Sequence, residues 1–387
     1  MTVKRLTILG STGSVGTQTL DLIGETPGAY QICALVGGRN VALLAEQARR
    51  FRPEITVISD EALLPALREA LAGEELEVAG GRAAVLEAAA REAEWTMSAI
   101  TGVAGLEPTL AAVGQGGTIA FACKESLVSA GDVFLRAVAA AGATLLPVDS
   151  EHNAILQAMA DGNGKQVEKI ILTASGGPFR NHSLEEMRGI TREAALRHPV
   201  WSMGAKISVD SATMFNKGLE VIEAARLFNL PSARIEVLVH PQSVIHGMVC
   251  YTDGSVLAQL GTPDMRIPIA HALAWPERLA TQAPRLDLTQ VARLDFHAPD
   301  EVRFPALRLA RLALLAGGGA PAVLNAANEV AVAAFLERRI GFLDIAGIVE
   351  TVMDKMGAPA LPDLETVLAV DAAARDAAQA LAGARAA

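Results

Sequence analysis

The first 148 residues alternate short apolar runs with segments of helical periodicity, and no other feature limits the fold of this chain as strongly. The alternation predicts a parallel β-sheet covered by helices on both faces. We expect strands at Leu6–Leu9, Gln31–Val36, Ile55–Ile58, Glu75–Val78, Thr96–Ile100, Thr118–Ala122 and Thr144–Val148. Helix-like stretches such as Val41–Phe51 and Leu127–Ala140 lie between the strands.

A glycine-rich loop follows the first predicted strand directly. Gly10, Gly13 and Gly16 have the spacing G-x-x-G-x-x-G, and an apolar helix-like segment comes next. Glycines at such positions permit a tight turn and let a phosphate approach the N–H groups of a helix N-terminus. Residues 1–148 are therefore expected to form a Rossmann-type domain that binds a dinucleotide. A glycine turn in some other α/β protein is the alternative.

The end of the second predicted strand indicates which dinucleotide is bound. NAD-binding sheets place an acidic residue there for the ribose hydroxyls, whereas an arginine accepts the 2′-phosphate of NADP. This chain has Gly37-Gly38-Arg39-Asn40 at that point, without Asp or Glu. The sequence therefore favours NADP over NAD, and the alternative is that Arg39 is a solvated loop charge.

Two acidic segments that lie far apart in the sequence together suggest one cation site. Asp149 and Glu151 follow the last predicted strand, and Asn216, Glu220 and Glu223 are spaced i, i+4 and i+7, which places them on one helix face. Carboxylates from two distant segments suit a hard divalent cation that prefers oxygen. For the first pair alone, the alternative is an acidic first turn of a helix.

Further groups suggest a site for an anionic substrate. Asn216 and Lys217 suit a phosphate-like group. Lys124, at the end of a predicted strand, suits an oxyanion or a phosphate, or else it is a charge at a helix start. Cys123 beside it has no histidine that can be assigned as its base, so a thiol nucleophile is not favoured. His198 lies in a long segment at residues 175–205 that we interpret as a lid, together with Trp201 and Met203.

The remaining chain divides into three further parts. Residues 149–275 are expected to form an α+β catalytic domain that carries the lid, residues 276–300 a linker, and residues 301–387 a C-terminal helical bundle. In the catalytic domain we expect strands at Val167–Thr173, Arg234–His240, Val244–Tyr251 and Ser255–Leu260 and a helix at Ala212–Asn229. The C-terminal helices are expected at Pro305–Leu315, Ala320–Arg338, Asp344–Lys355 and Leu364–Ala382.

Composition excludes some classes of partner and location. A formal net charge of −10, with no basic face interleaved with aromatic residues, argues against a nucleic-acid binder. The three cysteines are far apart and leave no complete disulfide framework, which fits a reducing compartment. No apolar run reaches the roughly 18 residues of a membrane span, and no signal-peptide pattern is present. A cytoplasmic location is expected.

Several strings of this chain, in their order and spacing, resemble the 1-deoxy-D-xylulose 5-phosphate reductoisomerase family. They extend over nearly the whole chain and comprise Leu9–Ser14, Lys124–Val128, Pro147–Ile155, Ser175–Phe179, Trp201–Gly204, Lys206–Met214, Asn216–Glu220, His240–His246, Pro263–Arg266 and Leu324–Glu329. The resemblance implies a homodimeric enzyme of the non-mevalonate route to isoprenoids. Such an enzyme rearranges 1-deoxy-D-xylulose 5-phosphate and reduces the product with NADPH to 2-C-methyl-D-erythritol 4-phosphate.

The same resemblance implies roles for individual residues. Asp149, Glu151 and Glu220 match the ligands of Mg²⁺ or Mn²⁺, with Co²⁺ as a further candidate metal. Lys124, Glu151 and His198 match catalytic positions. Positions that bind the sugar phosphate are matched by Ser150, Ser175, His198, Ser211, Asn216 and Lys217. Positions that bind NADPH are matched by Thr12, Gly13, Ser14, Val15, Gly38, Arg39, Asn40, Cys123, Glu125 and Gly204.

One position departs from the family pattern. The family commonly has Asn-Lys-Glu-Ser where this chain has Cys123-Lys124-Glu125-Ser126, and a thiol cannot supply the paired donor and acceptor of an amide. Only backbone contacts to the cofactor are then expected at Cys123. Two other functions stay open at this point: an NADP-dependent dehydrogenase of the semialdehyde dehydrogenase type, and a non-enzymatic NADPH sensor.

Overall fold

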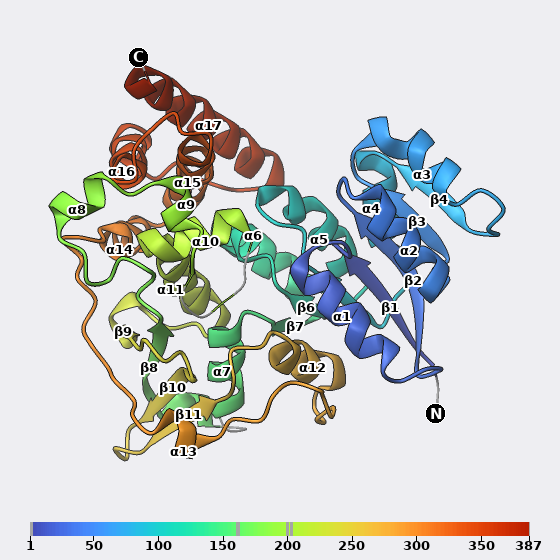
Figure 1. Cartoon of the computed structure of the whole chain (residues 1–387), viewed down its shortest axis with the longest axis horizontal. Helices are drawn as coiled ribbons and strands as arrows, with labels where there is room; N and C mark the ends of the chain where they lie inside the picture. Colours follow the sequence, from blue (N-terminus) through green and yellow to red (C-terminus); the bar gives the residue numbers. More distant parts are fainter. Residues whose placement is uncertain (1–2, 160–162, 199–200, 202–203, 387) are drawn as a thin grey trace. The chain divides into compact units, whose positions relative to one another are not determined.

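The structure is a computed structural model that describes residues 3–159, 163–198, 201 and 204–386. The chain divides into two compact units (Figure 1). Unit 1 comprises Met1–Ser126, Phe134–Asn153 and Asp264–Ala283, and unit 2 comprises Leu127–Val133, Ala154–Pro263 and Pro284–Ala387. The functional boundaries expected at residues 148, 275 and 300 stay predictions.

Unit 1 is built on a seven-stranded sheet in the order β4-β3-β2-β1-β5-β6-β7, and every neighbouring pair is parallel. The strands are β1 (Lys4–Leu9), β2 (Tyr30–Gly37), β3 (Ile55–Ile58), β4 (Glu77–Gly80), β5 (Trp95–Ser98), β6 (Thr118–Phe121) and β7 (Thr144–Pro147). Successive side chains of a strand point to opposite faces, and every residue of β3 and β5 is buried. Both faces of the sheet are therefore covered, which confirms the predicted α/β class; β4 begins two residues later than expected.

The covering helices of unit 1 come from two parts of the chain. They are α1 (Ser14–Gly24), α2 (Val41–Phe51), α3 (Leu64–Ala70), α4 (Arg82–Ala89), α5 (Leu106–Val113) and α12 (Arg266–Ala274). Helix α12 packs against α1, β6 and β7, although it was expected in the catalytic domain. The indole N–H of Trp95, in β5, donates a hydrogen bond of 2.9 Å to the carbonyl of Ala272.

Helix α6 (Lys124–Ala141) covers the helix-like stretch expected at Leu127–Ala140, with a break at Gly131 that the sequence did not indicate. Gly131 has φ +39° and ψ −110°, which interrupts the backbone hydrogen bonds of the helix. The guanidinium group of Arg226 donates to the carbonyls of Leu127 and Val128 just before the break. Arg226 therefore supplies hydrogen bonds to two buried carbonyl groups that the break would otherwise leave without a donor.

Unit 2 contains a mixed four-stranded sheet in the order β11-β10-β8-β9. Its strands are β8 (Val167–Ala174), β9 (Ile235–Val239), β10 (Ile245–Tyr251) and β11 (Val256–Leu260). Strands β8 and β9 are parallel, whereas β10 is antiparallel to both β8 and β11. The predicted antiparallel pair around Thr252-Asp253-Gly254 is confirmed.

The helices of unit 2 surround a single core. They are α8 (Leu184–Arg188), α9 (Arg192–Ala195), α10 (Ala205–Thr213), α11 (Phe215–Leu227), α13 (Leu288–Val291), α14 (Ala306–Ala316), α15 (Ala320–Leu336), α16 (Asp344–Met356) and α17 (Leu364–Ala386), while α7 (Ser150–Ala158) passes from unit 1 into unit 2. The one helix expected at Ala212–Asn229 is two, because Met214 adopts φ +67° between α10 and α11. Leu219 of α11, Ala310 of α14 and Val323 of α15 belong to one cluster of buried side chains.

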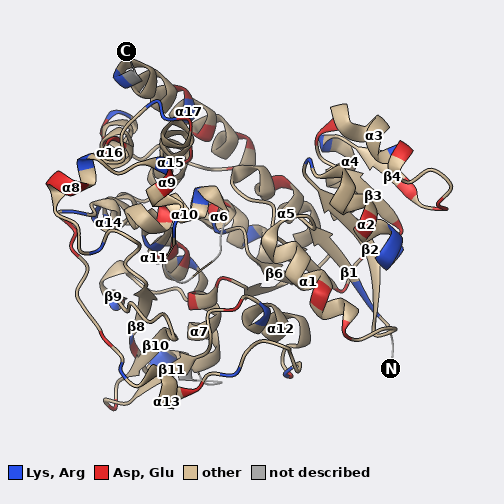
Figure 2. Ribbon diagram, viewed as in Figure 1, with Lys and Arg blue, Asp and Glu red and all other residues tan. Residues whose placement is uncertain are grey.

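Neither the distribution of charged residues nor the hydropathy of the described helices indicates a further structural feature. Lys and Arg are interspersed with Asp and Glu along both units (Figure 2). In the ranges that the structure describes, no helix combines the length and apolar character needed to span a membrane.

Candidate functional site

The glycine loop after β1 forms the turn that the sequence predicts. Gly10 has φ +91°, and a Cβ there would lie 2.7 Å from the carbonyl carbon of Ala99. A Cβ at Gly16 would lie 2.6 Å from the Cα of Ser11. Only glycine fits both places, so the loop turns tightly enough to expose the start of α1.

The N-terminus of α1 fits the diphosphate of a dinucleotide. Gly13 is the N-cap residue, and no side chain caps the helix there. Gly13 and Ser14 are exposed, while Thr12 and Val15 are half-buried. The N–H groups of the first turn are thus accessible to an anion, and the helix dipole favours it.

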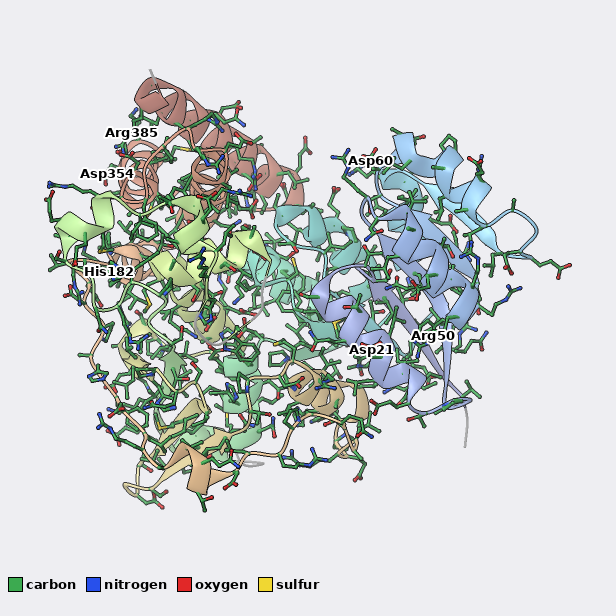
Figure 3. All side chains as sticks on the ribbon, viewed as in Figure 1. Asp21, Arg50, Asp60, His182, Asp354 and Arg385 are labelled. Carbon is green, nitrogen blue, oxygen red and sulfur yellow. The ribbon has the colours of Figure 1, made fainter. Side chains whose placement is uncertain are left out.

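Arg39 lies beyond the end of β2, as expected for a group that contacts the adenosine ribose. Its side chain is 82% exposed, and its Nε lies 3.1 Å from a carboxylate oxygen of Asp60 (labelled in Figure 3). Asn40 caps α2 by accepting a hydrogen bond from the N–H of Leu43, and Gly38 is exposed. Asp60 was not predicted as a partner of Arg39. It follows β3, and it lies near Arg39 because β3 is the neighbour of β2 in the sheet, which residue spacing does not reveal.

Lys124 and Asp149 form an ion pair in unit 1. Lys124 opens α6 after β6, Asp149 follows β7, and their side chains are only 8% and 12% exposed. The hydroxyl of Ser150 donates to the carboxylate of Glu151, the next residue in α7. Since β6 and β7 are adjacent parallel strands, the fold brings together groups that the sequence separates widely.

Cys123 and Glu125, on either side of Lys124, are both buried. The sulfur of Cys123 lies 3.3 Å from the carbonyl oxygen of Gly102 and 3.0 Å from the hydroxyl of Ser126. At 1% exposure the thiol packs as a small core group and is not accessible to a substrate.

His198 connects two other predicted residues within unit 2. Its Nδ1 accepts a hydrogen bond of 2.8 Å from the backbone N–H of Trp201, so Nδ1 carries no proton. The proton of the neutral ring is therefore on Nε2, which donates to the hydroxyl of Ser175 at 3.0 Å. Burial lowers the pKa of His198, which agrees with the neutral form. Met203, also expected in the lid, lies outside the described residues.

This tautomer leaves the hydroxyl proton of Ser175 available. The oxygen of Ser175 accepts hydrogen bonds from His198 and from the backbone N–H of Gly177. Its own O–H then has no acceptor elsewhere in the described part of the chain. Ser175 is thus oriented as a donor toward an anion, which fits a phosphate-binding role.

Asn216 and Glu220 lie on one face of α11, as their spacing predicts, and Lys217 also contacts Glu220. The amide of Asn216 donates a hydrogen bond of 2.6 Å to one carboxylate oxygen of Glu220, and the ammonium of Lys217 pairs with the other. Lys217 and Glu220 are 3% and 1% exposed, and Glu223 is also buried at 1%. A buried carboxylate held in this way is a hard oxygen donor suited to a divalent cation.

Ser211 and Gly204 lie at opposite ends of α10. Gly204 is its exposed N-cap residue, and Ser211 lies in its last turn. A Cβ at Gly177 would lie 2.8 Å from the carbonyl oxygen of Ser211, so the turn that begins at Ser175 packs closely on this end of the helix. Of the predicted substrate residues, Ser175, Ser211, Asn216, Lys217 and His198 therefore belong to unit 2, whereas Ser150 belongs to unit 1.

One buried contact near Ser211 was not predicted from the sequence. Asp210 is 1% exposed and accepts hydrogen bonds from the amide of Asn328, at 2.8 Å, and from Lys206, at 2.9 Å. The available signal was a polar Asn328 inside the mostly apolar helix α15, which also carries Asn325 and Glu329. This contact anchors the helix that carries Ser211.

Comparison with known proteins identifies the family. The profile described as 1-deoxy-D-xylulose 5-phosphate reductoisomerase matches residues 6–131, and two profiles for C-terminal domains of the same enzyme match residues 145–228 and 260–377. The reductoisomerase of Gluconobacter oxydans is 61% identical over 98% of this chain and 93% of its own length. That of Rhodospirillum centenum is 59% identical over 96% of this chain and 93% of its own.

Solved structures agree with these sequence matches. The reductoisomerase of Zymomonas mobilis in complex with NADPH has a TM-score of 0.93 and 55% identity, over 98% of this chain and 99% of its own. A DOX-P reductoisomerase in complex with NADPH, fosmidomycin and magnesium has a TM-score of 0.93 and 43% identity, over 98% of each chain. Profiles, relatives and structures coincide along almost the whole sequence, and this chain belongs to the 1-deoxy-D-xylulose 5-phosphate reductoisomerase family.

Proposed function

We propose that this chain converts 1-deoxy-D-xylulose 5-phosphate into 2-C-methyl-D-erythritol 4-phosphate with NADPH and Mg²⁺ or Mn²⁺. One observation within unit 1 carries the proposal. The glycine loop, Lys124 and Asp149 follow β1, β6 and β7, and the carboxyl ends of parallel strands meet at one edge of a sheet. Cofactor groups and carboxylates are therefore brought to the same edge.

We assign the cation to Asp149, Glu151 and Glu220, which offer only hard oxygen donors. The family resemblance supports this set, and the burial of Glu220 beside a cationic partner supports it further. Thr12 to Val15, Gly38, Arg39, Asn40, Cys123, Glu125 and Gly204 are assigned to NADPH. For Cys123 the contact is through the backbone, because its thiol is buried.

The substrate phosphate is assigned to Ser175, Ser211, Asn216 and Lys217. Ser175 donates its hydroxyl proton, and Lys217 supplies positive charge. Because the phosphate is remote from the reacting carbons, its binding energy orients them. The hydrogen bond between His198 and Trp201 ties the lid segment to Ser175 and helps to exclude water.

The reaction first rearranges the carbon skeleton, most simply by retro-aldol cleavage and re-addition, and then reduces the aldehyde that results. When bound, the cation acts as a Lewis acid on the ketone and hydroxyl oxygens, and NADPH supplies the hydride. Lys124 and Ser150 orient the reacting end of the substrate from unit 1. The lid keeps the aldehyde from escaping before reduction.

The semialdehyde dehydrogenase alternative needs an accessible nucleophilic cysteine, and Cys123 is 1% exposed. A Cys123→Ala variant should therefore keep most of its activity.

We also propose, from the family resemblance alone, that the chain acts as a cytoplasmic homodimer. Sedimentation equilibrium of the purified protein tests the dimer.

The direct test is an assay of purified, folded protein with NADPH, Mn²⁺ and 1-deoxy-D-xylulose 5-phosphate. We expect NADPH absorbance to fall and NMR to identify 2-C-methyl-D-erythritol 4-phosphate. Omission of the cation should stop both changes. Cofactor oxidation that continues without the cation, or a folded protein that oxidises no NADPH, would contradict the proposal.

A further inference from the structure

A cavity of about 240 Å³ opens within unit 2, next to the residues assigned to the substrate but separate from them. Gly176, Met214 and Val239 contribute to its lining, together with Arg180, Arg303 and Phe304. Ser175, Ser211, Asn216 and Lys217 do not line it. The cavity is therefore a second pocket, which shares backbone segments with the proposed phosphate site.

Its charged groups leave an excess of positive charge. Asp300 accepts hydrogen bonds from the backbone N–H groups of Arg303 and Val302 and from Nε of Arg303, and these bonds hold the pKa of its carboxyl below the usual range. Arg303 also donates to the carbonyls of Arg180 and His182, the second of which is labelled in Figure 3. Asp300 and Arg303 thus neutralise each other.

Arg180 is the charge that remains. Arg180 is a half-buried residue, and its side chain forms no hydrogen bond or ion pair with a carboxylate or carbonyl group in the described part of the chain. The apolar part of the lining consists of Met214, Val239 and Phe304, whose exposures are 4%, 8% and 6%. A lining that combines a cationic residue with apolar side chains suits a ligand with an anionic end and an apolar part.

We propose that this cavity binds a small amphiphilic anion, in which a phosphate monoester or a carboxylate on a short carbon chain pairs with Arg180. The cavity lies just below the roughly 300–1,000 Å³ range of drug-sized ligand pockets, so the ligand is small. The guanidinium fork binds the anionic end bidentately, and the carbon chain covers Met214, Val239 and Phe304.

The position of the cavity couples this ligand to the substrate, a consequence that rests on the proposed function. Gly176 follows Ser175 directly, and Met214 joins the helix that carries Ser211 to the helix that carries Asn216 and Lys217. Gly176 and Met214 both have positive φ, at +80° and +67°, so each is a constrained junction. A ligand packed against them changes the affinity for the substrate phosphate, and the coupling is reciprocal.

Calorimetry of the full chain with n-butyl phosphate, pentanoate and n-butanol tests the proposal. Saturating 1-deoxy-D-xylulose 5-phosphate without NADPH fills the substrate site and prevents turnover. We expect one n-butyl phosphate or pentanoate per chain under these conditions, and the tighter of the two identifies the anionic class. Arg180→Met should weaken binding at least tenfold, while Arg188→Met, which removes an exposed arginine paired with Glu185, should change it less than twofold.

Three results would overturn the proposal: binding abolished by the substrate, equal affinity in Arg180→Met, or n-butanol bound as tightly as the anions. A crystal soaked with n-butyl phosphate gives an independent readout, because its phosphate should lie within hydrogen-bond distance of Arg180. Failure of the proposed function is seen separately, as a folded protein that oxidises no NADPH when it is supplied with 1-deoxy-D-xylulose 5-phosphate and Mn²⁺.

Discussion

The buried ammonium group of Lys217 pairs with the carboxylate of Glu220, one turn further along α11. Each side chain therefore balances the charge of the other in a place with little access to water. Our assignments give the two residues different ligands, a phosphate for Lys217 and a cation for Glu220. The pair holds both groups in position until these ligands arrive.

Glu220→Gln should lower kcat/KM about 100-fold and weaken the dependence on Mn²⁺, because an amide is a poorer ligand than a carboxylate. Steady-state assays across a Mn²⁺ titration measure both effects. Glu236→Gln is the matched control, since Glu236 is an exposed carboxylate of unit 2 that pairs with Lys169. Activity and metal dependence near wild type in Glu220→Gln would show that the cation assignment is wrong.

Ser175→Ala should raise the KM for 1-deoxy-D-xylulose 5-phosphate about 10- to 100-fold and leave the KM for NADPH unchanged. The variant removes one hydrogen bond to a charged group, worth about 1.5–3 kcal/mol. Ser255→Ala, in the turn between β10 and β11, serves as the control. A parallel rise in both KM values would indicate a general structural effect and contradict the assignment.

The pKa of His198 predicts a loss of function in acid. Burial holds this pKa below its ordinary value of 6.5, so neutral His198 contributes stability that is complete above pH 6.5 and declines as the pH falls toward the folded-state pKa. Protonation of Nδ1 also removes the acceptor for the N–H of Trp201. We expect kcat/KM to fall about tenfold per pH unit below that pKa.

A pH profile of kcat/KM, combined with an NMR titration of the histidine, measures this effect. His198→Gln provides the comparison, because its amide does not titrate. The acid limb assigned to His198 should be absent from the profile of the variant. An unchanged profile would assign the limb to another group.

Arg39→Ala should raise the KM for NADPH about 10- to 100-fold and affect NADH little, since only NADPH carries the 2′-phosphate. Arg82→Ala is the matched control, because Arg82 is likewise an exposed arginine of unit 1, 70% accessible and paired with Glu107. Equal losses with the two cofactors would refute the role of Arg39.

Gly131→Ala should destabilise the protein by about 2–4 kcal/mol, because alanine is strained at this φ and its Cβ would lie 2.8 Å from Nη1 of Arg226. Urea unfolding measures the loss. Gly189→Ala tests whether any added methyl group has this effect, since its nearest neighbour would be 3.8 Å away. Comparable stability of the two variants would mean that the break in α6 is not maintained by this contact.

The sequence predicts the sheet of unit 1 well because both of its faces are covered, which gives β2 the continuous apolar run Ile32–Val36. It also places Lys124 and Asp149 after strands of that sheet, although it does not show that the two side chains form an ion pair. The ion pair between Arg39 and Asp60 depends on strand order, which residue spacing does not reveal. Similarly, the break at Gly131 is stabilised by Arg226, a residue too distant in sequence for local patterns to indicate it.

The late position of α12 in the chain has a consequence for synthesis on the ribosome. Unit 1 lacks this helix until roughly 110 residues of unit 2 have been made, which takes on the order of ten seconds. During that interval the indole of Trp95 lacks its acceptor on Ala272, and the surfaces of β6 and β7 that α12 covers stay open to solvent. The nascent chain therefore carries a temporary apolar surface that a chaperone can bind, and it disappears when α12 docks.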